Sequence, residues 1–374
     1  MTMRPPAEIG MTLDQIDTPA LVIDLDAFER NMKTLADAAA AAGVKVRPHA
    51  KTHKSPVIAL KQMALGAVGA CCQKVSEAET LVLGGVPDVL VSNEIVGATK
   101  LKRLMALTRL ARVAVCVDDI VHIDMIDAAA AAADTTIDLL VEVNMGGNRC
   151  GVEPGEPALR LVQHILRSRR LRFRGLQAYH GTAQHRRTPA ERRAEISQAI
   201  ERARTTRDLI VANGIPCPEV TGAGTGTFAL EAASGVYTEL QCGSYIFMDA
   251  DYARNQGEDG QPERKFEHSL FVLATVMSRP TDERALCDAG HKAASVDSGF
   301  PVIHGFDEAE YVRAADEHGL LNLKRPTNRL RIGEKIKLIP GHCDPTVNLH
   351  DWYVGLRGDR VEAIWPVAAR GAMF

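Results

Sequence analysis

The sequence lacks a long apolar run, a dense block of basic residues and a signal-peptide core. Nowhere do about 18 consecutive apolar residues occur, the length that a membrane-spanning helix needs. A formal net charge of −3 without clustered Lys and Arg argues against nucleic acid as the main partner, because phosphate binding needs concentrated positive charge. We therefore expect a cytoplasmic protein that binds neither nucleic acid nor membranes.

Cysteine is scarce and shows no disulfide spacing. The chain has 8 cysteines among 374 residues, and several lie in apolar, strand-like segments. Free cysteine is among the most buried residue types, and small disulfide-bonded domains are far richer in cysteine. We therefore interpret Cys71, Cys72, Cys116 and Cys150 as reduced thiols at strand-like, buried positions.

The first two-thirds of the chain alternates short β-branched runs with longer helical patterns, of which residues 26–42 and 189–213 are examples. This alternation indicates repeated βα units around a parallel sheet. Eight such units favour a closed (β/α)8 barrel of about 250 residues, which leaves enough chain for a smaller second domain. The expected strands are residues 44–49, 67–72, 88–92, 112–117, 137–143, 171–179, 219–221 and 239–243.

After Asp251 the pattern changes to β-like segments with few helical repeats, at residues 269–278, 285–288 and 331–339. Residues 18–25 are also strand-like, and they can join this second unit before the chain enters the barrel. We therefore expect an α/β protein with a barrel over residues 21–252 and a β-rich domain over residues 1–20 plus 253–374.

Polar residues follow the expected strands. In a parallel barrel, the loops at the carboxyl ends of the strands converge on one mouth, where active sites lie. The residues that we expect to gather there, in strand order, are His49 and Lys51, Gln73, Asn93 and Glu94, Asp118, Asn144 and Arg149, His180 and His185, and 222–226.

Lys51 is the candidate nucleophile at this mouth. It lies in the segment RPHAKTHK, residues 47–54, directly after the first expected strand. Burial and neighbouring positive charge can lower the pKa of such a lysine, which makes its amine able to form a Schiff base with a carbonyl cofactor. An ordinary solvated lysine is the alternative. Lys54 is the nearest rival, but its place in the chain is less favourable.

Two glycine-rich loops form a candidate phosphate site. The segment TGAGTGT, residues 221–227, follows the seventh expected strand, and QCGSY, residues 241–245, follows the eighth. Exposed backbone N–H groups and hydroxyls in such loops bind anions, and the last two βα units of a barrel often share a phosphate. The spacing is not the dinucleotide-binding fingerprint. A simple tight turn is the alternative for the first loop.

Arg149 lies between glycines in the segment GGNRCG, residues 146–151. Its guanidinium suits a phenolic oxygen, a ring nitrogen or a carboxylate of a bound ligand. An ion pair that joins two loops is the alternative.

His342 and Asp344 are candidate metal ligands in the segment PGHCDP, residues 340–345. The preceding run, residues 335–339, is strand-like, so we expect extended backbone that places both side chains on one face and Cys343 on the other. A mixed N/O pair with vacant positions suits Mn²⁺, Mg²⁺, Zn²⁺ or Co²⁺. His-x-Asp is a weak signal alone, because a histidine is more often hydrogen-bonded within the fold.

These segments resemble the metal-dependent D-threonine aldolases and 3-hydroxy-D-aspartate aldolases, together with their D-serine dehydratase relatives. These enzymes share the alanine-racemase-like pyridoxal-phosphate fold of type III. The likeness runs from end to end, with the segments in the same order. They are residues 17–20 (DTPA), 47–51 (RPHAK), 71–78 (CCQKVSEA), 177–181 (QAYHG), 224–226 (GTG), 243–245 (GSY) and 341–345 (GHCDP).

The resemblance implies roles for individual residues. Lys51 would carry pyridoxal 5'-phosphate, and His185 would take the proton of the substrate's β-hydroxyl. The metal ligands would be His342 and Asp344, with Mn²⁺ or Mg²⁺ preferred; the dehydratase relatives more often have cysteine at the second position. The remaining cofactor-binding residues would be Gln73, Arg149, Tyr179, Gly224, Thr225, Gly226, Gly243 and Ser244.

The implied activity is that of a carbon-carbon lyase. It would cleave a D-configured β-hydroxy-α-amino acid of the threonine or 3-hydroxyaspartate type to glycine and acetaldehyde or glyoxylate, and the enzyme would be a homodimer. The same groups could instead remove an α-proton and expel the hydroxyl, as a D-serine or 3-hydroxyaspartate dehydratase that yields a keto acid and ammonia. A cofactor carrier without turnover and a metal hydrolase with a structural Lys51 are further alternatives.

Overall fold

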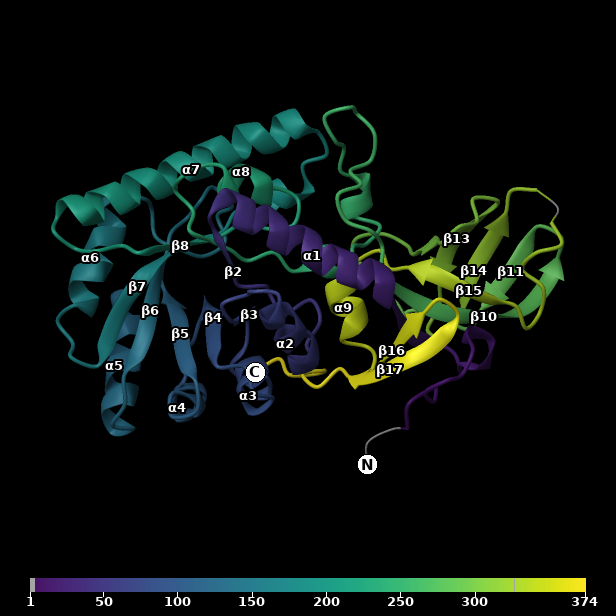
Figure 1. Ribbon diagram of the computed structural model, residues 1–374, viewed down its shortest axis with the longest axis horizontal. Helices are drawn as coiled ribbons and strands as arrows, with labels where there is room; N and C mark the ends of the chain where they lie inside the picture. The colour runs from purple at the N-terminus through teal and green to yellow at the C-terminus, as the bar shows by residue number, and fades with distance from the viewer. Residues whose placement is uncertain (1–3, 326) are drawn as a thin grey trace.

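The computed structural model describes residues 4–325 and 327–374 and places two sheets side by side (Figure 1). The first sheet has eight parallel strands in the order β2-β9-β8-β7-β6-β5-β4-β3. A bridge between His49 and Cys71 joins the two end strands and closes a barrel. The expected (β/α)8 architecture is confirmed. The strands are β2 (Lys45–Val46), β3 (Ala70–Cys72), β4 (Asp88–Glu94), β5 (Arg112–Val117), β6 (Ile137–Glu142), β7 (Leu171–Ala178), β8 (Glu219–Gly222) and β9 (Glu239–Leu240).

Helices cover the outside of the barrel, and their ends follow local capping chemistry. Asp24 accepts a hydrogen bond from the N–H of Ala27 and so begins α1. Thr188 and Glu191 form a capping box at the start of α7. The helices are α1 (Leu25–Ala42), α2 (Pro56–Ala64), α3 (Val75–Leu83), α4 (Ala98–Leu107), α5 (Ile120–Ala132), α6 (Glu156–Ile165), α7 (Pro189–Ala212) and α8 (Phe228–Ala232).

The interior of the barrel is filled by small and medium-sized side chains. Cys71, Leu90, Ala114, Cys116 and Leu140 form one buried cluster contributed by neighbouring strands. Because successive side chains of a strand point to opposite faces, the alternate residues pack outward against the helices in a second, larger cluster. All eight cysteines are free, and Cys71, Cys72 and Cys116 are buried as expected, whereas Cys150 is only partly buried.

A network of buried ion pairs occupies the amino end of the barrel. Arg47, which is 1% exposed, donates to Glu239 at 2.9 Å and to Asp88 at 2.8 Å. Arg174 pairs with Asp88 at 3.2 Å and with Glu219 at 2.7 Å. Charge therefore replaces apolar packing at the end of the barrel that lies opposite the expected active site.

The second sheet is mostly antiparallel and contains β1 between β10 and β16. The expected β-rich second unit and the participation of residues 18–25 are thus observed. Because β1 begins at Ala20, the proposed division at residue 21 falls within this strand. The strands are β1 (Ala20–Asp24), β10 (Leu270–Thr281), β11 (Arg284–Cys287), β12 (Val302–Ile303), β13 (Ala309–Ala314), β14 (Gly319–Leu323), β15 (Lys335–Ile339), β16 (Trp352–Arg357) and β17 (Arg360–Pro366).

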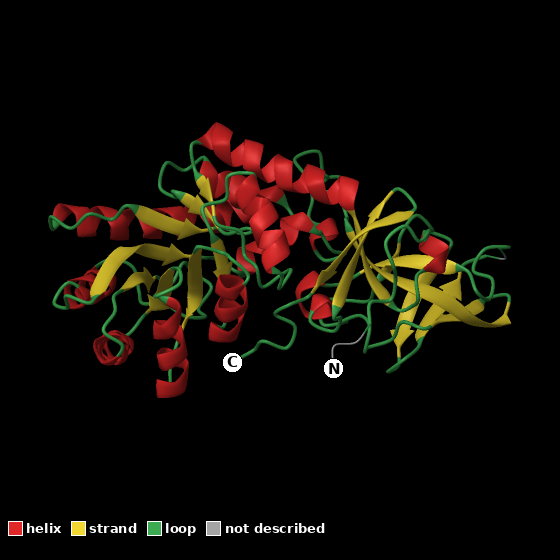
Figure 2. Ribbon diagram, turned by 60° about the horizontal axis from the view of Figure 1, so that its bottom comes forward, coloured by secondary structure: helices red, strands yellow, loops and turns green. Residues whose placement is uncertain are grey.

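The two units share one hydrophobic cluster, and Figure 1 shows α1 beside their junction. Figure 2 shows helices around the barrel and a second unit that is rich in strands. Phe28 of α1 contacts Phe247 with ring centroids 6.2 Å apart, and Phe247 contacts Tyr353 of β16 at 5.8 Å. The Tyr353 hydroxyl donates to the carbonyl of His53 at 2.7 Å. The second sheet therefore touches the loop that follows β2. No helix in the described residues is long and apolar enough to cross a membrane.

Because the ion-pair network is buried, substituting one of its residues should destabilise the protein more than substituting a residue of an exposed ion pair. Arg47→Ala should lower the free energy of unfolding by about 3–5 kcal/mol, because it leaves the Glu239 and Asp88 carboxylates without their buried partner. Arg30→Ala is the matched control, since Arg30 pairs with Glu267 at the surface, and it should cost far less than Arg47→Ala. Urea unfolding measures both. Equal losses would contradict a structural role for the network.

Candidate active site

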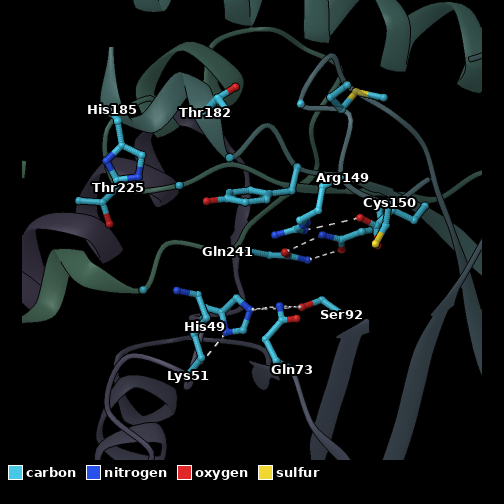
Figure 3. Close-up of a pocket in the computed structure, with 18 of the residues that line it drawn as sticks. His49, Lys51, Gln73, Ser92, Arg149, Cys150, Thr182, His185, Thr225 and Gln241 are labelled. Atoms are coloured by element: carbon cyan, nitrogen blue, oxygen red, sulfur yellow. Dashed lines mark hydrogen bonds and ion pairs between the residues drawn. The ribbon is translucent and has the colours of Figure 1, made fainter. Parts of the chain in front are cut away.

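A cavity of about 360 Å³ opens at the carboxyl ends of the barrel strands (Figure 3). It brings together residues from loops that are far apart in the sequence. Within the described residues, the lining does not include Gly226, His342 or Asp344, although Asp344 touches a residue that lines it. The sequence-predicted residues that line the cavity are His49, Lys51, Gln73, Asn144, Arg149, Tyr179, His185, Gly224, Thr225, Gly243 and Ser244.

Lys51 lies in the loop after β2, and its Nζ contacts Oδ2 of Asp344. Burial lowers the pKa of the Lys51 ammonium, but the negative charge of Asp344 outweighs this effect, so the pKa is raised. The expectation of a lowered pKa was wrong, because it considered the neighbouring positive charges and not the carboxylate that arrives from the second unit. The Lys51 amine lies in the cavity, paired with an acid.

Asp344 belongs to a short helix, α9 (Cys343–Val347), with His342 as its N-cap residue. The prediction of extended backbone through Asp344 is therefore wrong, because β15 ends at Ile339 and α9 begins at Cys343. Cys343 does face away, because its thiol is buried and donates to the carbonyl of Met248 at 3.2 Å.

The Asp344 carboxylate is charged and only half satisfied. Burial alone would raise its pKa, but the positive charge of Lys51 and the nearby His342 lower the pKa to about 2. Its Oδ1 is buried and has no hydrogen-bond partner among the described residues. Nδ1 of His342 lies 2.8 Å from Oδ2 of Asp297, so Nε2 is the ring nitrogen that points away from this carboxylate.

His185 ends the 3₁₀ turn η2 (Thr182–His185) and is held by Asp251. Nδ1 of its ring lies 2.5 Å from Oδ2 of Asp251, and the ring contacts Tyr252 with centroids 5.6 Å apart. The side chain is 51% exposed and lines the cavity. Its Nε2 points away from Asp251, which is the orientation that a general base needs.

The two glycine-rich loops line the cavity and form a narrow cradle, and Figure 3 shows Thr225 of the first loop close to His185. A Cβ on Gly224 would lie 2.5 Å from Gln184, and one on Gly243 would lie 2.5 Å from the Thr52 hydroxyl. Thr225 is buried, and its Oγ1 has no hydrogen-bond partner in the described part of the chain. A small polar ligand fits this arrangement.

Gly226 lies in the same loop but faces elsewhere. Its N–H donates to Oε1 of Gln184 at 3.0 Å, so this donor is already used within the fold. Gly226 borders a neighbouring depression beside α8.

Arg149 and Tyr179 form a cation–π pair in the wall of the cavity that Lys51 also lines. The guanidinium of Arg149 lies 5.5 Å from the centre of the Tyr179 ring, and its Nη2 is 3.7 Å from Oε1 of Glu142. Burial and the neighbouring Glu94 raise the pKa of the Glu142 carboxyl. A flat aromatic ligand between Arg149 and the Lys51 loop would meet a cation on its edge.

Ser92, which sequence reasoning missed, shapes the cavity beside two residues that were predicted, His49 and Gln73. The Gln73 amide nitrogen lies 2.9 Å from Nε2 of His49, with the Ser92 hydroxyl at 3.2 Å from the same nitrogen. Burial and the charge of Lys51 lower the pKa of His49 well below its usual value, so the ring is neutral. Ser92 ends an expected strand, and that position is the one signal that could have found it. Further missed lining residues are Glu142, Gln177, Gln241 and Tyr252.

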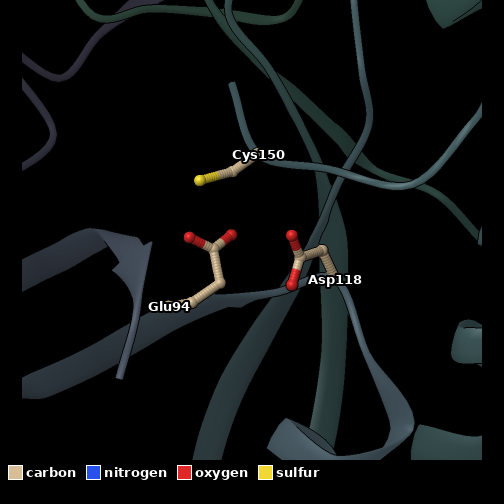
Figure 4. Close-up of side chains that lie close together, drawn as sticks. All are labelled: Glu94, Asp118 and Cys150. Carbon is tan, nitrogen blue, oxygen red and sulfur yellow. The ribbon is translucent and has the colours of Figure 1, made fainter. Parts of the chain in front are cut away.

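Glu94, Asp118 and Cys150 converge beside the cavity, with potential ligand atoms within 4.8 Å of one another (Figure 4). Asp118 accepts the N–H of Gly151 at 2.9 Å and so anchors the loop that carries Arg149. Burial and Glu94 raise the pKa of the Cys150 thiol to about 11, so the thiol is protonated at neutral pH. We interpret these contacts as loop anchoring.

Comparison with known proteins defines the class. The chain belongs to the family of the alanine racemase N-terminal domain, whose family model matches residues 23–251, and a putative serine dehydratase domain model matches residues 269–356. Alanine-racemase-like architecture and the resemblance drawn from the sequence are both confirmed.

Within this class, the chain belongs to the family that contains D-threonine and 3-hydroxy-D-aspartate aldolases. It is 44% identical to a 3-hydroxy-D-aspartate aldolase of Paracoccus denitrificans (strain Pd 1222), over 98% of this chain and 95% of the relative. It is 46% identical to a D-threonine aldolase of Arthrobacter sp, over 99% and 97%. The crystal structure of D-threonine aldolase from Filomicrobium marinum aligns over 100% of both chains, with a TM-score of 0.96 and 52% identity.

The helix α8, which follows the first glycine-rich loop, contains a buried acid that predicts a pH-dependent stability. Glu231 of α8 is 1% exposed, and its Oε1 accepts from the Thr227 hydroxyl at 2.8 Å. Burial raises the pKa of Glu231 to about 7, so the folded state favours the protonated acid. Its stabilising contribution is complete below about pH 4.5 and is lost as the pH rises through 7.

Glu231→Gln should therefore be more stable than the wild type at pH 8, by up to about 3 kcal/mol, and similar to it at pH 4. Unfolding by urea at the two pH values measures the difference. Glu201→Gln on the exposed face of α7 is the control and should show no such change. A variant that gains nothing at pH 8 would contradict the buried, protonated state.

Proposed function

We propose that this chain is a pyridoxal-phosphate-dependent and divalent-metal-dependent aldolase. It cleaves a D-configured β-hydroxy-α-amino acid, of the threonine or 3-hydroxyaspartate type, to glycine and an aldehyde. The observation that carries the proposal is the contact of Lys51 with Asp344 at the mouth of the cavity, which brings the amine of the barrel to the acid of the second unit. The activities named for the relatives support the same reaction.

The residues present fit pyridoxal 5'-phosphate. The unsatisfied Thr225 hydroxyl and the backbone of Gly224 and Gly243, which line the cavity, suit its phosphate, with Ser244 beside them. Lys51 would hold the cofactor covalently, and Arg149 would face the edge of its ring. Tyr179, His49 and Gln73 would complete the ring's surroundings. In this assignment Gly226 shapes the loop and does not contact the phosphate through its N–H.

A divalent metal fits the pair His342 and Asp344. Oδ1 of Asp344 is buried without a partner, and Asp297 orients the His342 ring so that Nε2 is the available nitrogen. One imidazole and one carboxylate leave positions for water and substrate, which suits Mn²⁺ or Mg²⁺, with Zn²⁺ and Co²⁺ also accommodated by this donor set.

When bound, pyridoxal phosphate supplies the electron sink for cleavage at Cα, and the metal supplies a Lewis acid for the β-oxygen. The residues of the chain do the rest. His185 removes the proton of the β-hydroxyl through Nε2, and Asp251 holds the ring and stabilises the imidazolium that results. Arg149 and Tyr179, which contact each other in the cavity wall, would bind and orient the cofactor ring.

The proposal extends to assembly and location. We propose a homodimer in the cytoplasm, by analogy with the family, and a division at residues 21–252 and 1–20 plus 253–374. Size-exclusion chromatography with light scattering tests the assembly, since a dimer has twice the mass of the chain.

Product analysis tests the reaction. The purified protein is incubated with pyridoxal phosphate, Mn²⁺ or Mg²⁺, and the D- and L-isomers of threonine and 3-hydroxyaspartate. We expect glycine from a D-isomer and loss of turnover with a chelator. A keto acid and ammonia would identify a dehydratase instead, and turnover of none of these substrates would refute the proposal.

Lys51 and Asp344 should separate cofactor attachment from turnover. After borohydride reduction, mass spectrometry should find the cofactor on the Lys51 peptide of the wild type and on no peptide of Lys51→Ala. Asp344→Asn should keep the attached cofactor and lose at least about 100-fold in kcat/KM, since it removes a metal ligand. Lys54→Gln is the control, because the Lys54 ammonium pairs with Glu77 at 2.6 Å. Attachment to Lys54, or a fully active Asp344→Asn, would overturn the assignment.

A further inference from the structure

The segment Asp249–Arg254 lies where the barrel ends and the second unit begins, and it contacts both. Asp249 is completely buried. Its Oδ2 accepts the N–H of Cys343 at 3.1 Å, and its Oδ1 accepts the N–H of Tyr252 at 2.9 Å. Cys343 lies between the two proposed metal ligands, so the Asp249 carboxylate fixes the first turn of α9 through its backbone.

A backbone contact strengthens this attachment. The N–H of Ala250 donates to the carbonyl of Pro340 at 2.9 Å, two residues before His342. The turn that carries His342 and Asp344 is thus held at two points: Ala250 binds the carbonyl of Pro340 before it, and Asp249 binds the N–H of Cys343 at its start.

The same segment also holds the side chain of His185, through Asp251. Asp251 is 5% exposed and accepts from three side chains at once. Its Oδ2 lies 2.5 Å from Nδ1 of His185, while Oδ1 accepts from Nη2 of Arg187 at 2.6 Å and contacts Nη2 of Arg254. The orientation of the proposed base therefore depends on a residue two positions from Asp249.

Arg254 extends the segment into the loop behind His342. Its Nη2 contacts Asp251 and also donates to the carbonyl of Ser298 at 3.0 Å. The neighbouring Asp297 is the residue that holds Nδ1 of His342 at 2.8 Å, and the Ser298 hydroxyl donates to the same carboxylate oxygen at 3.0 Å. A continuous series of contacts runs from His185 through Asp251 and Arg254 to His342.

We propose that Asp249 and Arg254 are positioning residues that set the metal ligands and the base relative to each other. The inference rests on the proposed function, because it gives His342 and Asp344 the role of metal ligands and His185 the role of base. Asp249 fixes the backbone between the ligands, and Arg254 joins the carboxylate that orients His185 to the loop that orients His342. Neither side chain lines the cavity, so both act through other residues.

Substituting Asp249 or Arg254 should lower the affinity for the metal by a measurable factor. Residues that orient metal ligands without touching the metal typically change affinity by 10-fold to 100-fold when they are lost. His342 is partly exposed, and Asp297 holds its ring at Nδ1. A substitution in the segment should therefore appear directly in metal affinity, independently of turnover.

Mn²⁺ binding to the pyridoxal-phosphate-loaded enzyme tests the inference, with free Mn²⁺ measured by electron paramagnetic resonance. Asp249→Asn and Arg254→Gln should each raise the Kd at least about 10-fold while cofactor attachment and the circular dichroism spectrum stay unchanged. Arg193→Gln is the matched control, since Arg193 makes an exposed ion pair with Glu258 near the same face, and its Kd should stay within about 2-fold of the wild type.

Asp251→Asn gives a second, independent readout. Its side chain contacts His185, Arg187 and Arg254, and a role confined to His185 would leave Mn²⁺ affinity unaltered. The proposed connection through Arg254 predicts a several-fold rise in the Kd of Mn²⁺ as well as a fall in kcat. Wild-type Mn²⁺ affinity in both Arg254→Gln and Asp251→Asn would overturn the inference, whereas a wild-type enzyme that binds no Mn²⁺ would overturn the proposed function itself.

Discussion

The contact between Lys51 and Asp344 is the interaction on which the site depends. It joins the loop after the first barrel strand to a helical turn of the second unit, 293 positions further along the chain. Each charge stabilises the other: the pKa of Lys51 is raised and that of Asp344 is lowered to about 2. A buried charge without its partner is costly, so this pair favours the arrangement in which the two units meet at the cavity.

Several contacts outside the cavity hold the Lys51 loop in place. The Tyr353 hydroxyl donates to the carbonyl of His53, and the N–H of Ala369 donates to the carbonyl of Lys54 at 2.9 Å. The chain then returns to the barrel, where the carbonyl of Phe374 accepts the N–H of Ser76 at the start of α3. The second unit thus supplies the turn that carries His342 and Asp344 and also supports the lysine loop from behind. Under the proposed function, the barrel would hold the cofactor and this turn of the second unit would hold the metal.

The sequence was sufficient for the barrel and for most of the cavity lining, because both rest on local patterns. Eight strand runs and the polar residues that follow them are visible without coordinates, and Lys51, Arg149 and the glycine-rich loops all follow from that rule. The helical turn at Cys343 was missed because the strand-like run before it suggested that extended backbone continues through His342 and Asp344, although Pro340 and Gly341 mark the strand's end at Ile339. The sign of the Lys51 pKa shift was missed for a related reason, since its partner is distant in the sequence.

Partners from distant segments were also beyond sequence reasoning. Asp251 and Asp297 look like ordinary surface acids in the sequence, and only the fold places each beside an imidazole. Arg47 and Arg174 lie within expected strands, and nothing in the local pattern indicates that their charges are buried in an ion network. Gly226 matches the family's motif, but Gln184 occupies its N–H. In each case the role of a residue is set by a neighbour in space that the pattern of the sequence does not identify.

A crystal structure of the protein with pyridoxal phosphate and Mn²⁺, phased to show anomalous scattering from manganese, tests the central claim most directly. The account predicts continuous density from Nζ of Lys51 to the cofactor and an anomalous peak at Nε2 of His342 and Oδ1 of Asp344, both facing one cavity. A manganese peak at Glu94, Asp118 and Cys150 with none at His342, or a cofactor bound away from Lys51, would contradict it.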